Sequence, residues 1–402
     1  MKSANIAASS FEAAPVGVAG RGAEPIKVLH VAETLIGGPA SYINAVLTDQ
    51  IGHFGREGVR VIGPSDHLRY IAEPNVCVGF ERSGRDFASA HRLKRCIEDV
   101  IAAFDPEIVH LHSFFAGFVA RAMVHRKSLA CRSVIYCPHG WAFSRRVSLA
   151  SRWMSRGVEW ALQGRADAIH CISQHEYLCG ARAGIRGDRM FCLPNRIPDA
   201  PAEPFRAPSS IFSPAASLRV AFVGRLDQQK GFDVLVQAAR ITRAGVEFAV
   251  AGAPAVDGFG KGEPIPANMR LLGWLAPAET QALVREADVV VVPSRWEGFS
   301  LAALEAMRAG KALVASRVDA LPELVDHQIT GLLTPPCDAR ALAEALGSLS
   351  RERAREMGRA ARRKFELFFS FEMYANALRW RYGALCFARA GQAEHKRLRR
   401  AG

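Results

Sequence analysis

The clearest chemical feature of this chain is a pair of carboxylates, Glu297 and Glu305, on either side of a short turn. The apolar run 287–294 before the turn has the composition of a buried strand, and the run 301–309 after it has helical spacing. We therefore expect residues 297–300 to join the carboxyl end of a strand to the amino end of a helix. In an open α/β sheet, ligands bind at that edge, and backbone N–H groups at a helix terminus attract anions. Carboxylates beside an anion site suit a ligand with both phosphates and hydroxyls, such as a nucleotide sugar.

A basic turn between Gly224 and Gly231 is the second candidate. Arg225 offers a planar fork of N–H donors that suits phosphate oxygens, and Lys230 adds a point charge at the start of the next helix. The bracketing glycines let the backbone approach a ligand closely. The turn is neither a Walker loop nor a GxGxxG motif. Either turn alone is also compatible with a solvated loop, so the assignment depends on the two occurring together.

The overall composition indicates a folded protein with a marked excess of positive charge. Of the 402 residues, 49% are hydrophobic and 23% are charged, which supplies enough apolar surface for more than one core. The net charge of +13 implies an anionic substrate, an anionic membrane surface or nucleic acid. No apolar run is long enough to span a membrane. The nine cysteines are scattered and form no CxxC pair, so we expect buried, reduced thiols in a cytoplasmic protein.

Strand and helix patterns alternate through both halves of the chain and predict two α/β units with parallel sheets. The expected strands lie at 26–31, 59–62, 108–112, 133–136, 168–173, 218–224, 248–252, 269–273, 289–292 and 312–315. A stretch at 198–217 that is rich in Pro, Ser and Ala has the composition of a linker. Two such units joined by a linker would hold a ligand in the cleft between them.

Several motifs taken together resemble the signature of retaining family-4 glycosyltransferases of the GT-B fold, of the bacterial polysaccharide or lipopolysaccharide type. The motifs are Gly224-Arg-Leu-Asp…Lys230-Gly231, Glu297-Gly-Phe-Ser-Leu…Glu305-Ala, Gly331-Leu-Leu…Pro335, Gly37-Gly38, His139-Gly140, Ile172-Ser173 and Pro194-Asn195. They agree with the family in order and spacing over roughly residues 26–390. Agreement of several motifs in order is far more specific than any one of them.

The resemblance implies two Rossmann-like domains that face each other across a cleft, with a C-terminal helix that returns to the first domain. The chain is accordingly divided into a disordered leader (1–24), an acceptor-side domain (25–197), the linker (198–217), a nucleotide-sugar-binding domain (218–370), the returning helix (371–390) and a basic tail (391–402).

The resemblance also implies a role for each site residue. Arg225 and Lys230 match the basic pair that holds the donor diphosphate, Glu305 matches the acid that binds the ribose hydroxyls, and Glu297 matches the acid beside the transferred sugar. His139 matches a first-domain histidine near the donor sugar and the acceptor, so His139 and Glu297 are the expected catalytic residues. Further donor contacts are implied for Gly38, Gly298, Phe299, Ser300 and Leu301.

Other histidines near the expected strands need separate consideration. His110 and His170 lie within strands and fit core positions, whereas His112 ends its strand and could face the cleft. Arg196 departs from the family pattern, which has Asn-Gly where this chain has Asn195-Arg196. Since that glycine commonly permits a positive φ, the local turn and any role for Asn195 stay open.

The expected reaction moves a sugar from a nucleotide-sugar donor to a glycan or lipid-linked acceptor, with retention of configuration. The departing diphosphate carries negative charge, which Arg225, Lys230 and the helix terminus at 298–301 would stabilise. These groups can take the place of a metal ion, and the chain has no DxD run, so no metal or other cofactor is expected. We expect a front-face substitution; a covalent route through Glu297 is the alternative.

Positive charge gathers in and around the helix expected at 148–163, with Glu159 as the one acid among the basic residues. The arginines are Arg145, Arg146, Arg152, Arg156 and Arg165. A cationic helix with tryptophans suits the surface of an anionic bilayer, and a solvated helix face is the alternative. A second basic run lies at 396–400. Membrane binding would favour a lipid-linked acceptor on the inner face of the plasma membrane.

Three other functions compete with this interpretation. Another nucleotide-sugar enzyme on the same fold, of the synthase or epimerase type, would share the donor motifs. A nucleic-acid-binding protein would explain the charge, but no recognition-helix or RNP-like motif is present. A catalytically inactive scaffold would not need the intact set of Arg225, Lys230, Glu297 and Glu305. The sequence names neither the sugar, the base nor the acceptor.

Overall fold

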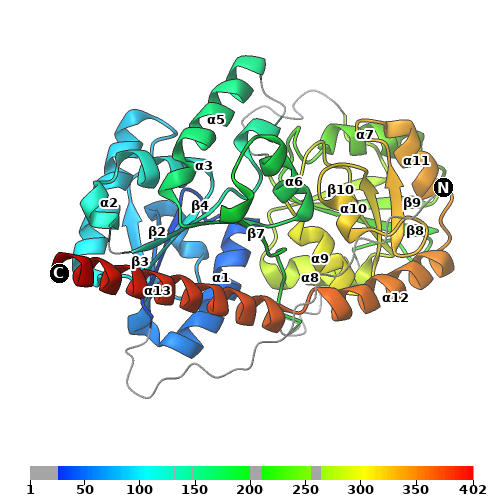
Figure 1. Ribbon diagram of the computed structural model, residues 1–402. Helices are drawn as coiled ribbons and strands as arrows, with labels where there is room; N and C mark the ends of the chain where they lie inside the picture. The colour runs from blue at the N-terminus through cyan, green and yellow to red at the C-terminus, as the bar shows by residue number, and fades with distance from the viewer. Residues whose placement is uncertain (1–25, 131, 146–147, 200–210, 255–263, 402) are drawn as a thin grey trace, which may run out of the picture.

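The computed structural model describes residues 26–401 except 131, 146–147, 200–210 and 255–263. These residues form two α/β lobes that lie side by side, and the last helix runs from the second lobe back along the first (Figure 1). The predicted fold class, two parallel-sheet α/β domains with a returning helix, is therefore confirmed. The predicted leader at 1–24 and residues 200–210 of the predicted linker lie outside the described residues.

The first lobe is built on a seven-stranded parallel sheet with the order β3-β2-β1-β4-β5-β6-β7. Its strands are β1 (Val28–Ala32), β2 (Val59–Pro64), β3 (Cys77–Phe80), β4 (Ile108–His112), β5 (Ser133–Cys137), β6 (Ala168–Cys171) and β7 (Met190–Cys192). The strand order reverses between β1 and β4, so the loops that follow these strands diverge at the carboxyl edge of the sheet. Such a reversal point is where doubly wound sheets open a binding crevice.

The second lobe repeats this plan with six parallel strands in the order β10-β9-β8-β11-β12-β13. They are β8 (Leu218–Val223), β9 (Val246–Ala251), β10 (Met269–Gly273), β11 (Val289–Val292), β12 (Ala312–Ser316) and β13 (Gly331–Thr334). The four valines of β11 are all buried because helices cover both faces of a parallel sheet. Here the order reverses between β8 and β11, which carry the two donor-side motifs at their carboxyl ends.

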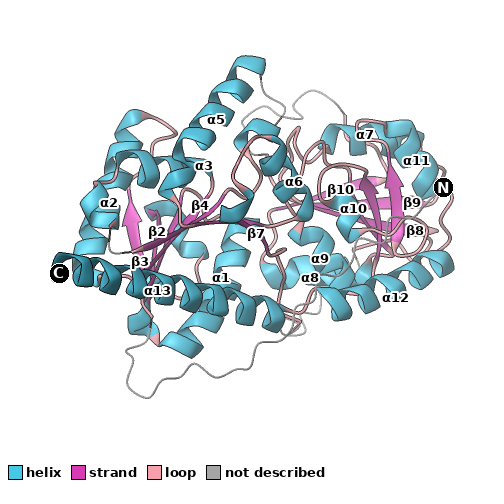
Figure 2. Ribbon diagram, in the orientation of Figure 1, coloured by secondary structure: helices cyan, strands magenta, loops and turns pink. Residues whose placement is uncertain are grey.

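Helices connect the strands of both sheets and lie on either side of them (Figure 2). The first lobe contains α1 (Gly38–Phe54), α2 (Phe87–Phe104), α3 (Phe114–Phe118), α4 (Arg126–Leu129), α5 (Leu149–Leu162) and α6 (Gln174–Arg182), with a π-helical turn at Val119–Met123. The second contains α7 (Phe232–Ile241), α8 (Pro277–Glu286), α9 (Leu301–Arg308), α10 (Leu321–Leu324), α11 (Ala339–Gly347) and α12 (Arg351–Phe368). Short 3-10 turns lie at Arg56–Gly58, Ser65–Tyr70, Pro74–Val76, Ala142–Ser144, Gln163–Arg165 and Gly187–Arg189.

The last helix, α13 (Phe371–Ala401), crosses back to the first lobe. The Tyr374 and Tyr42 hydroxyls lie 2.7 Å apart, and the Arg389 Nη2 atom donates to Asp167 Oδ2 at 2.8 Å. The predicted end of this helix at residue 390 was wrong, because the helix continues through the basic run that was expected to form a separate tail. Among the described residues, no helix is both long and apolar enough to cross a membrane.

Sequence reasoning missed three strands, β3, β7 and β13, and all three lie at sheet edges. They are only three or four residues long, and β3 contains an exposed glycine, so none shows a buried run of useful length. An edge strand is recruited by its neighbour in the sheet rather than by its own pattern. The described cysteines form no disulfide, but only Cys137 and Cys171 are buried; the others are half-buried and Cys337 is exposed, contrary to the expectation of burial.

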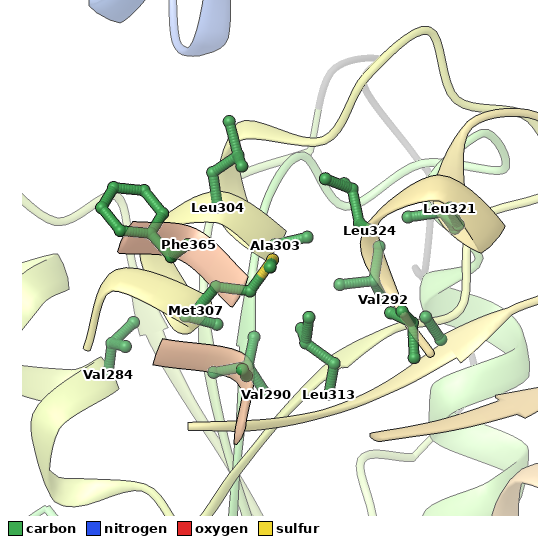
Figure 3. Close-up of a cluster of buried hydrophobic side chains, with 14 of the residues drawn as sticks. Val284, Val290, Val292, Ala303, Leu304, Met307, Leu313, Leu321, Leu324 and Phe365 are labelled. Atoms are coloured by element: carbon green, nitrogen blue, oxygen red, sulfur yellow. The ribbon is translucent and has the colours of Figure 1, made fainter. Parts of the chain in front are cut away.

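The core of the second lobe holds α9 against the sheet (Figure 3). Met307 of α9 points toward Val290 of β11 and Leu313 of β12, whereas Leu304 extends from the side of the helix away from them; all four side chains are buried. Phe365 of α12 closes the same cluster from the other side. This packing fixes the helix whose amino end and Glu305 form part of the candidate site.

Candidate active site

The site loops of the two lobes meet face to face. A Cβ atom placed on Gly298 would lie 3.3 Å from the His139 carbonyl oxygen, and one on Gly38 would lie 3.6 Å from Leu301 Cδ1. The Leu301 side chain packs against the cores of both lobes. The loops after β1, β5 and β11 therefore come together in one cleft, as a ligand held by both lobes requires.

Glu297 is held from three directions. Its Oε2 atom lies 2.5 Å from Lys230 Nζ and accepts from the Ser294 hydroxyl at 3.2 Å, and its backbone N–H donates to Asp319 Oδ2 at 2.8 Å. The carboxylate is 8% exposed. Lys230 was expected, with Arg225, to hold the donor diphosphate; the structure places its ammonium against Glu297, at the junction between the basic turn and the acidic one.

Arg225 keeps its guanidinium accessible, with 48% of the side chain exposed. One of its nitrogens donates to Gln229 Oε1 at 2.7 Å and lies 3.2 Å from Asp227 Oδ2. Both partners belong to the same turn, so they orient the guanidinium without covering it. Asp227 also accepts from the Lys230 backbone N–H at 2.8 Å, which closes the turn.

Gly231 serves packing rather than ligand approach. Its φ is +68°, and a Cβ atom there would lie 2.0 Å from the Pro293 carbonyl oxygen. Only glycine tolerates both conditions. The two donor-side turns are thus pressed together at the ends of β8 and β11, which brings Lys230 to Glu297.

The amino end of α9 offers unpaired backbone donors. Ser300 caps the helix by accepting from the Ala303 N–H at 3.3 Å. Within the described residues, the N–H groups of Gly298, Phe299 and Ser300 donate to no acceptor. The Phe299 side chain is buried near Phe369, with ring centroids 6.1 Å apart, so this residue can serve a ligand only through its backbone.

Glu305 lies about one turn from the start of α9 and is partly buried. Burial raises the pKa of this carboxyl above its usual value, and Arg308 opposes the shift. The Glu305 carboxylate accepts no hydrogen bond from the described residues. A half-buried acid without a partner would gain from hydroxyl donors of a ligand.

His139 is held in a strained backbone conformation at the carboxyl end of β5. Its φ is +51°, which is uncommon for a residue other than glycine and costs about 1–3 kcal/mol. The next residue, Gly140, donates its N–H to Glu176 Oε1 at 2.5 Å, and Trp141 Nε1 donates to the Glu176 carbonyl oxygen at 2.7 Å. Sequence reasoning did not identify Glu176. Burial raises the pKa of its carboxyl to about 7.

A layer of histidines lies beneath this loop on one face of the first sheet. His30 of β1 and His110 of β4 are register partners, and His112 follows two positions after His110. His110 and His170 are fully buried, as their positions within strands predicted. His112, which was left open, is buried and lies directly behind His139, with Nδ1 of the former 3.0 Å from Nε2 of the latter.

A second polar network bridges the lobes. His175 of α6 lies 3.3 Å from Asp319 of the second lobe through Nε2 and Oδ1. Glu323 of the second lobe accepts from the backbone N–H groups of Gln174 and His175 at 3.0 and 2.7 Å and so covers the amino end of α6. Because Asp319 also holds the backbone of Glu297, contact between the lobes and the position of that acid are linked.

Arg196, the residue that departs from the family pattern, adopts no positive φ. Its Nη1 atom donates to the Ser370 carbonyl oxygen at 3.2 Å, beside the bridge between Ile197 and Ser370 where the chain leaves α12 for α13. The turn that the sequence left open therefore has no left-handed residue at position 196. Neighbouring Asn195 is buried, and its backbone N–H donates to the Ile172 carbonyl oxygen at 3.4 Å.

Helix α5 presents an exposed apolar and basic surface. Glu159, counted in the sequence as the acid among these arginines, instead points inward: it accepts from buried Arg121 at 2.8 Å and from the Tyr136 hydroxyl at 2.5 Å. The outer face is thereby left without that acid. Its large exposed apolar residues are Leu149, Trp153, Met154 and Trp160. Arg146 lies outside the described residues.

Two Rossmann-like lobes whose loops meet in one cleft are the architecture of GT-B glycosyltransferases, and family comparisons agree. Residues 43–200 match the model described as Glycosyltransferase Family 4, and residues 217–352 match Glycosyl transferases group 1. An uncharacterized 41.2 kDa protein in the cps region of Klebsiella pneumoniae is 30% identical over 80% of this chain and 90% of its own length. The chain thus belongs to the family-4, group-1 glycosyltransferases.

Further similarities extend over most of the chain. The amylovoran biosynthesis glycosyltransferase AmsK of Erwinia amylovora is 27% identical over 71% of this chain and 72% of that protein. The structure of Anabaena Alr3699/HepE in complex with UDP-glucose superimposes with a TM-score of 0.72 at 16% identity, covering 89% of this chain and 100% of that one. At that identity the structural similarity supports the assignment of the fold alone.

Proposed function

We propose that this glycosyltransferase moves a sugar from a nucleotide-sugar donor to a hydroxyl of a glycan or lipid-linked acceptor, with retention of configuration. The observation that carries the proposal is a set of binding groups, each either accessible or unpaired, at one edge of the second sheet. Arg225 is half exposed, and the N–H groups of residues 298–300 are unpaired within the described residues. The Glu305 carboxylate also accepts no hydrogen bond from these residues. A diphosphate suits the first two, and ribose hydroxyls suit the third.

The chain's own charges support departure of the diphosphate. Arg225 and the amino end of α9 would stabilise the charge that develops on the leaving phosphate. Lys230 would share its ammonium between that phosphate and Glu297. Since these groups supply positive charge at the leaving oxygen, the proposed reaction needs no metal ion.

The proposed mechanism is front-face substitution, in which the leaving phosphate takes the acceptor proton. The contact between Lys230 and Glu297 favours this route over a covalent one, because an ion-paired carboxylate is a weakened nucleophile. His139, held across the cleft against Gly298, would orient the sugar or the acceptor.

The acceptor is proposed to belong to cell-surface polysaccharide or lipopolysaccharide biosynthesis at the inner face of the plasma membrane. Two observations support this. The relatives described above are named for a cps region and for amylovoran biosynthesis. The outer face of α5 combines tryptophans with arginines, a combination that suits an anionic lipid surface.

The first test is a thermal-shift panel of UDP, GDP, ADP and dTDP sugars, each with EDTA or Mg²⁺. A nucleotide that binds only the folded state raises its stability in proportion to RT ln(1 + [L]/Kd), so one base should stand out. We expect that shift to persist in EDTA and to be lost in Arg225→Ala. The productive donor is then incubated with and without acceptor glycans, and the anomeric proton of the product is assigned by NMR. Inversion, or isomerisation of the donor without acceptor, would contradict the proposal and favour an epimerase.

A further inference from the structure

A continuous chain of side-chain hydrogen bonds runs from the interior of the first lobe to the cleft. Gln50 Oε1 of α1 lies 2.9 Å from His30 Nε2, His30 Nδ1 lies 3.0 Å from His112 Nε2, and His112 Nδ1 lies 3.0 Å from His139 Nε2. Gln50, His30 and His112 are at most 4% exposed. His139, the last member, is partly exposed at the cleft.

The chemistry of each group determines the direction of this chain. A glutamine Oε1 atom can only accept, so His30 Nε2 must carry a proton. A neutral imidazole has one donor and one acceptor, so His30 Nδ1 is bare and accepts from His112 Nε2–H. By the same step, His112 Nδ1 is bare and accepts from His139 Nε2–H. The chain leaves His139 Nδ1 as an acceptor.

The burial of the rings supports the neutral forms that this argument requires. Burial lowers the pKa of His30 to about 4 and that of His139 to about 3. It also lowers the pKa of His112 well below its usual value, with His110, His139, His30 and His170 adding to the shift. None of these rings is therefore charged at neutral pH.

The open end of the chain lies where a substrate would be. Within the described residues, His139 Nδ1 has no hydrogen-bond partner and is not among the buried polar atoms left unpaired. The His139 carbonyl oxygen faces the second lobe at Gly298. The ring nitrogens of His30, His110 and His112 also lie within 4.8 Å of one another, a spacing that a metal could use. A hydrogen bond at 3.0 Å already joins His30 to His112, which favours the hydrogen-bond chain over a metal site.

We propose that Gln50, His30 and His112 are positioning residues that hold His139 in its Nε2–H tautomer, so that Nδ1 accepts a hydrogen bond from a hydroxyl in the cleft. The accepted hydroxyl belongs to the donor sugar or the acceptor, and this part rests on the proposed function. The tautomer of His139 is a property of the ligand-free protein and does not depend on the proposed function. The device gives a role to His30 of β1 and His112 of β4, which occupy buried positions where apolar side chains would otherwise pack.

The test is ¹⁵N NMR of the ligand-free, full-length protein labelled at the histidine ring nitrogens. Protonated and bare ring nitrogens resonate in separate ranges, and the His139 signals are assigned from their loss in His139→Gln. We expect wild-type His139 to be protonated at Nε2 and bare at Nδ1. Gln50→Leu and His30→Phe should shift it toward a mixture of tautomers, whereas Gln50→Glu, which keeps an acceptor, should restore the wild-type signals.

His170→Phe is the matched control. His170 lies in the same buried layer, but its Nε2 atom bonds the Leu193 carbonyl oxygen at 2.8 Å and it is no member of the chain. This variant should leave the His139 tautomer unchanged. If His30→Phe fails to fold, Gln50→Leu and Gln50→Glu still decide the matter.

Steady-state kinetics complete the test. Gln50→Leu should lower kcat by about five- to tenfold, the effect of losing one neutral hydrogen bond, and Gln50→Glu should recover it. A wild-type His139 protonated at Nδ1, an unchanged tautomer in Gln50→Leu, or Zn²⁺ that shifts the His30 and His112 signals would each overturn the proposal. An absence of sugar transfer together with the expected tautomer would refute only the proposed function.

Discussion

At the scale of single residues, the site is organised by pairs that restrain one another. Lys230 and Glu297 are in contact, so each sets the position of the other before any ligand arrives. Arg225 and Glu305 differ because each can still bind a ligand. The Arg225 guanidinium is exposed, and the Glu305 carboxylate accepts no hydrogen bond from the described residues. Substitutions at these two kinds of position should therefore behave differently.

Arg225→Ala and Glu305→Ala should weaken binding of the donor nucleotide without unfolding the protein. Neither side chain supports the core, so thermal denaturation without ligand should be nearly unchanged. Arg225→Ala should also lower kcat by about 10²-fold, the usual cost of removing one donor to a developing negative charge. Calorimetric titration with the nucleotide checks both variants, and wild-type affinity in both would refute the donor-site assignment.

Glu176 should make stability depend on pH. Burial raises the pKa of its carboxyl from 4.5 to about 7, so the folded state holds this proton more tightly than the unfolded state. Its contribution to the free energy of unfolding therefore falls as pH rises from about 4.5 to about 7. Glu176→Gln should flatten this part of the profile while lowering stability overall, since an amide cannot accept from both Gly140 and Ile172 N–H groups. Denaturation curves across this pH range measure the slope, and parallel profiles would contradict the assignment.

At the scale of elements, α5 combines a buried anchor with an exposed face. The Arg121 guanidinium lies 3.7 Å from the centroid of the Tyr136 ring and pairs with Glu159 of α5. Both charged side chains are at most 1% exposed. This anchor allows a helix with several large exposed apolar residues to remain docked on the lobe.

Arg121→Met should destabilise the protein by about 3–5 kcal/mol, because it leaves Glu159 buried and without its cation. The double variant Arg121→Met with Glu159→Leu should recover much of this loss, since no buried charge remains. Urea denaturation compares the two. A single variant as stable as wild type would show that the pair contributes little to holding α5.

The exposed face of α5 should bind anionic lipid. Trp153→Ser together with Trp160→Ser should reduce co-sedimentation with vesicles containing phosphatidylglycerol, because both rings are more than 60% exposed on this face. Trp380→Ser is the matched control, an equally exposed tryptophan on α13. Equal binding by the double variant and the control would argue for a solvated helix face instead.

At the scale of the whole molecule, His175 and Asp319 couple the two lobes. Hydrogen bonds to Asp319 and Cys179 raise the pKa of His175 to about 10. The ion pair's contribution to stability is therefore complete below pH 6.5 and is lost as pH rises toward 10. Glu176 interacts electrostatically with the His175 charge, and Glu323 accepts from the His175 backbone N–H.

His175→Asn should let the lobes separate more readily and should remove the pH dependence between 6.5 and 10. Small-angle scattering of the ligand-free protein should show a larger radius of gyration for the variant at pH 7, and KM for the donor should rise. His91→Asn, a substitution on the exposed surface of α2, controls for loss of a histidine. A variant as compact as wild type at pH 7 would contradict a role in holding the lobes together.

The sequence by itself determined the two α/β units, the parallel sheets and the position of the donor-side turns. These features are local: buried strands appear as apolar runs, and the basic and acidic turns are continuous segments with recognisable spacing. It could not place three of the four edge strands, the inward direction of Glu159 or the end of α13, because neighbours in space decide these.

Only the tertiary structure decided how the site residues are paired. Lys230 meets Glu297 across 67 positions, and His30 meets His112 across 82. Gln50 reaches Tyr382 of α13 across 332 positions, so even the last helix takes part in supporting the first lobe's interior. No local pattern records such contacts. They exist because two sheets with the same strand-order reversal place their loops at one cleft, and because packing leaves each buried polar group few partners to choose from.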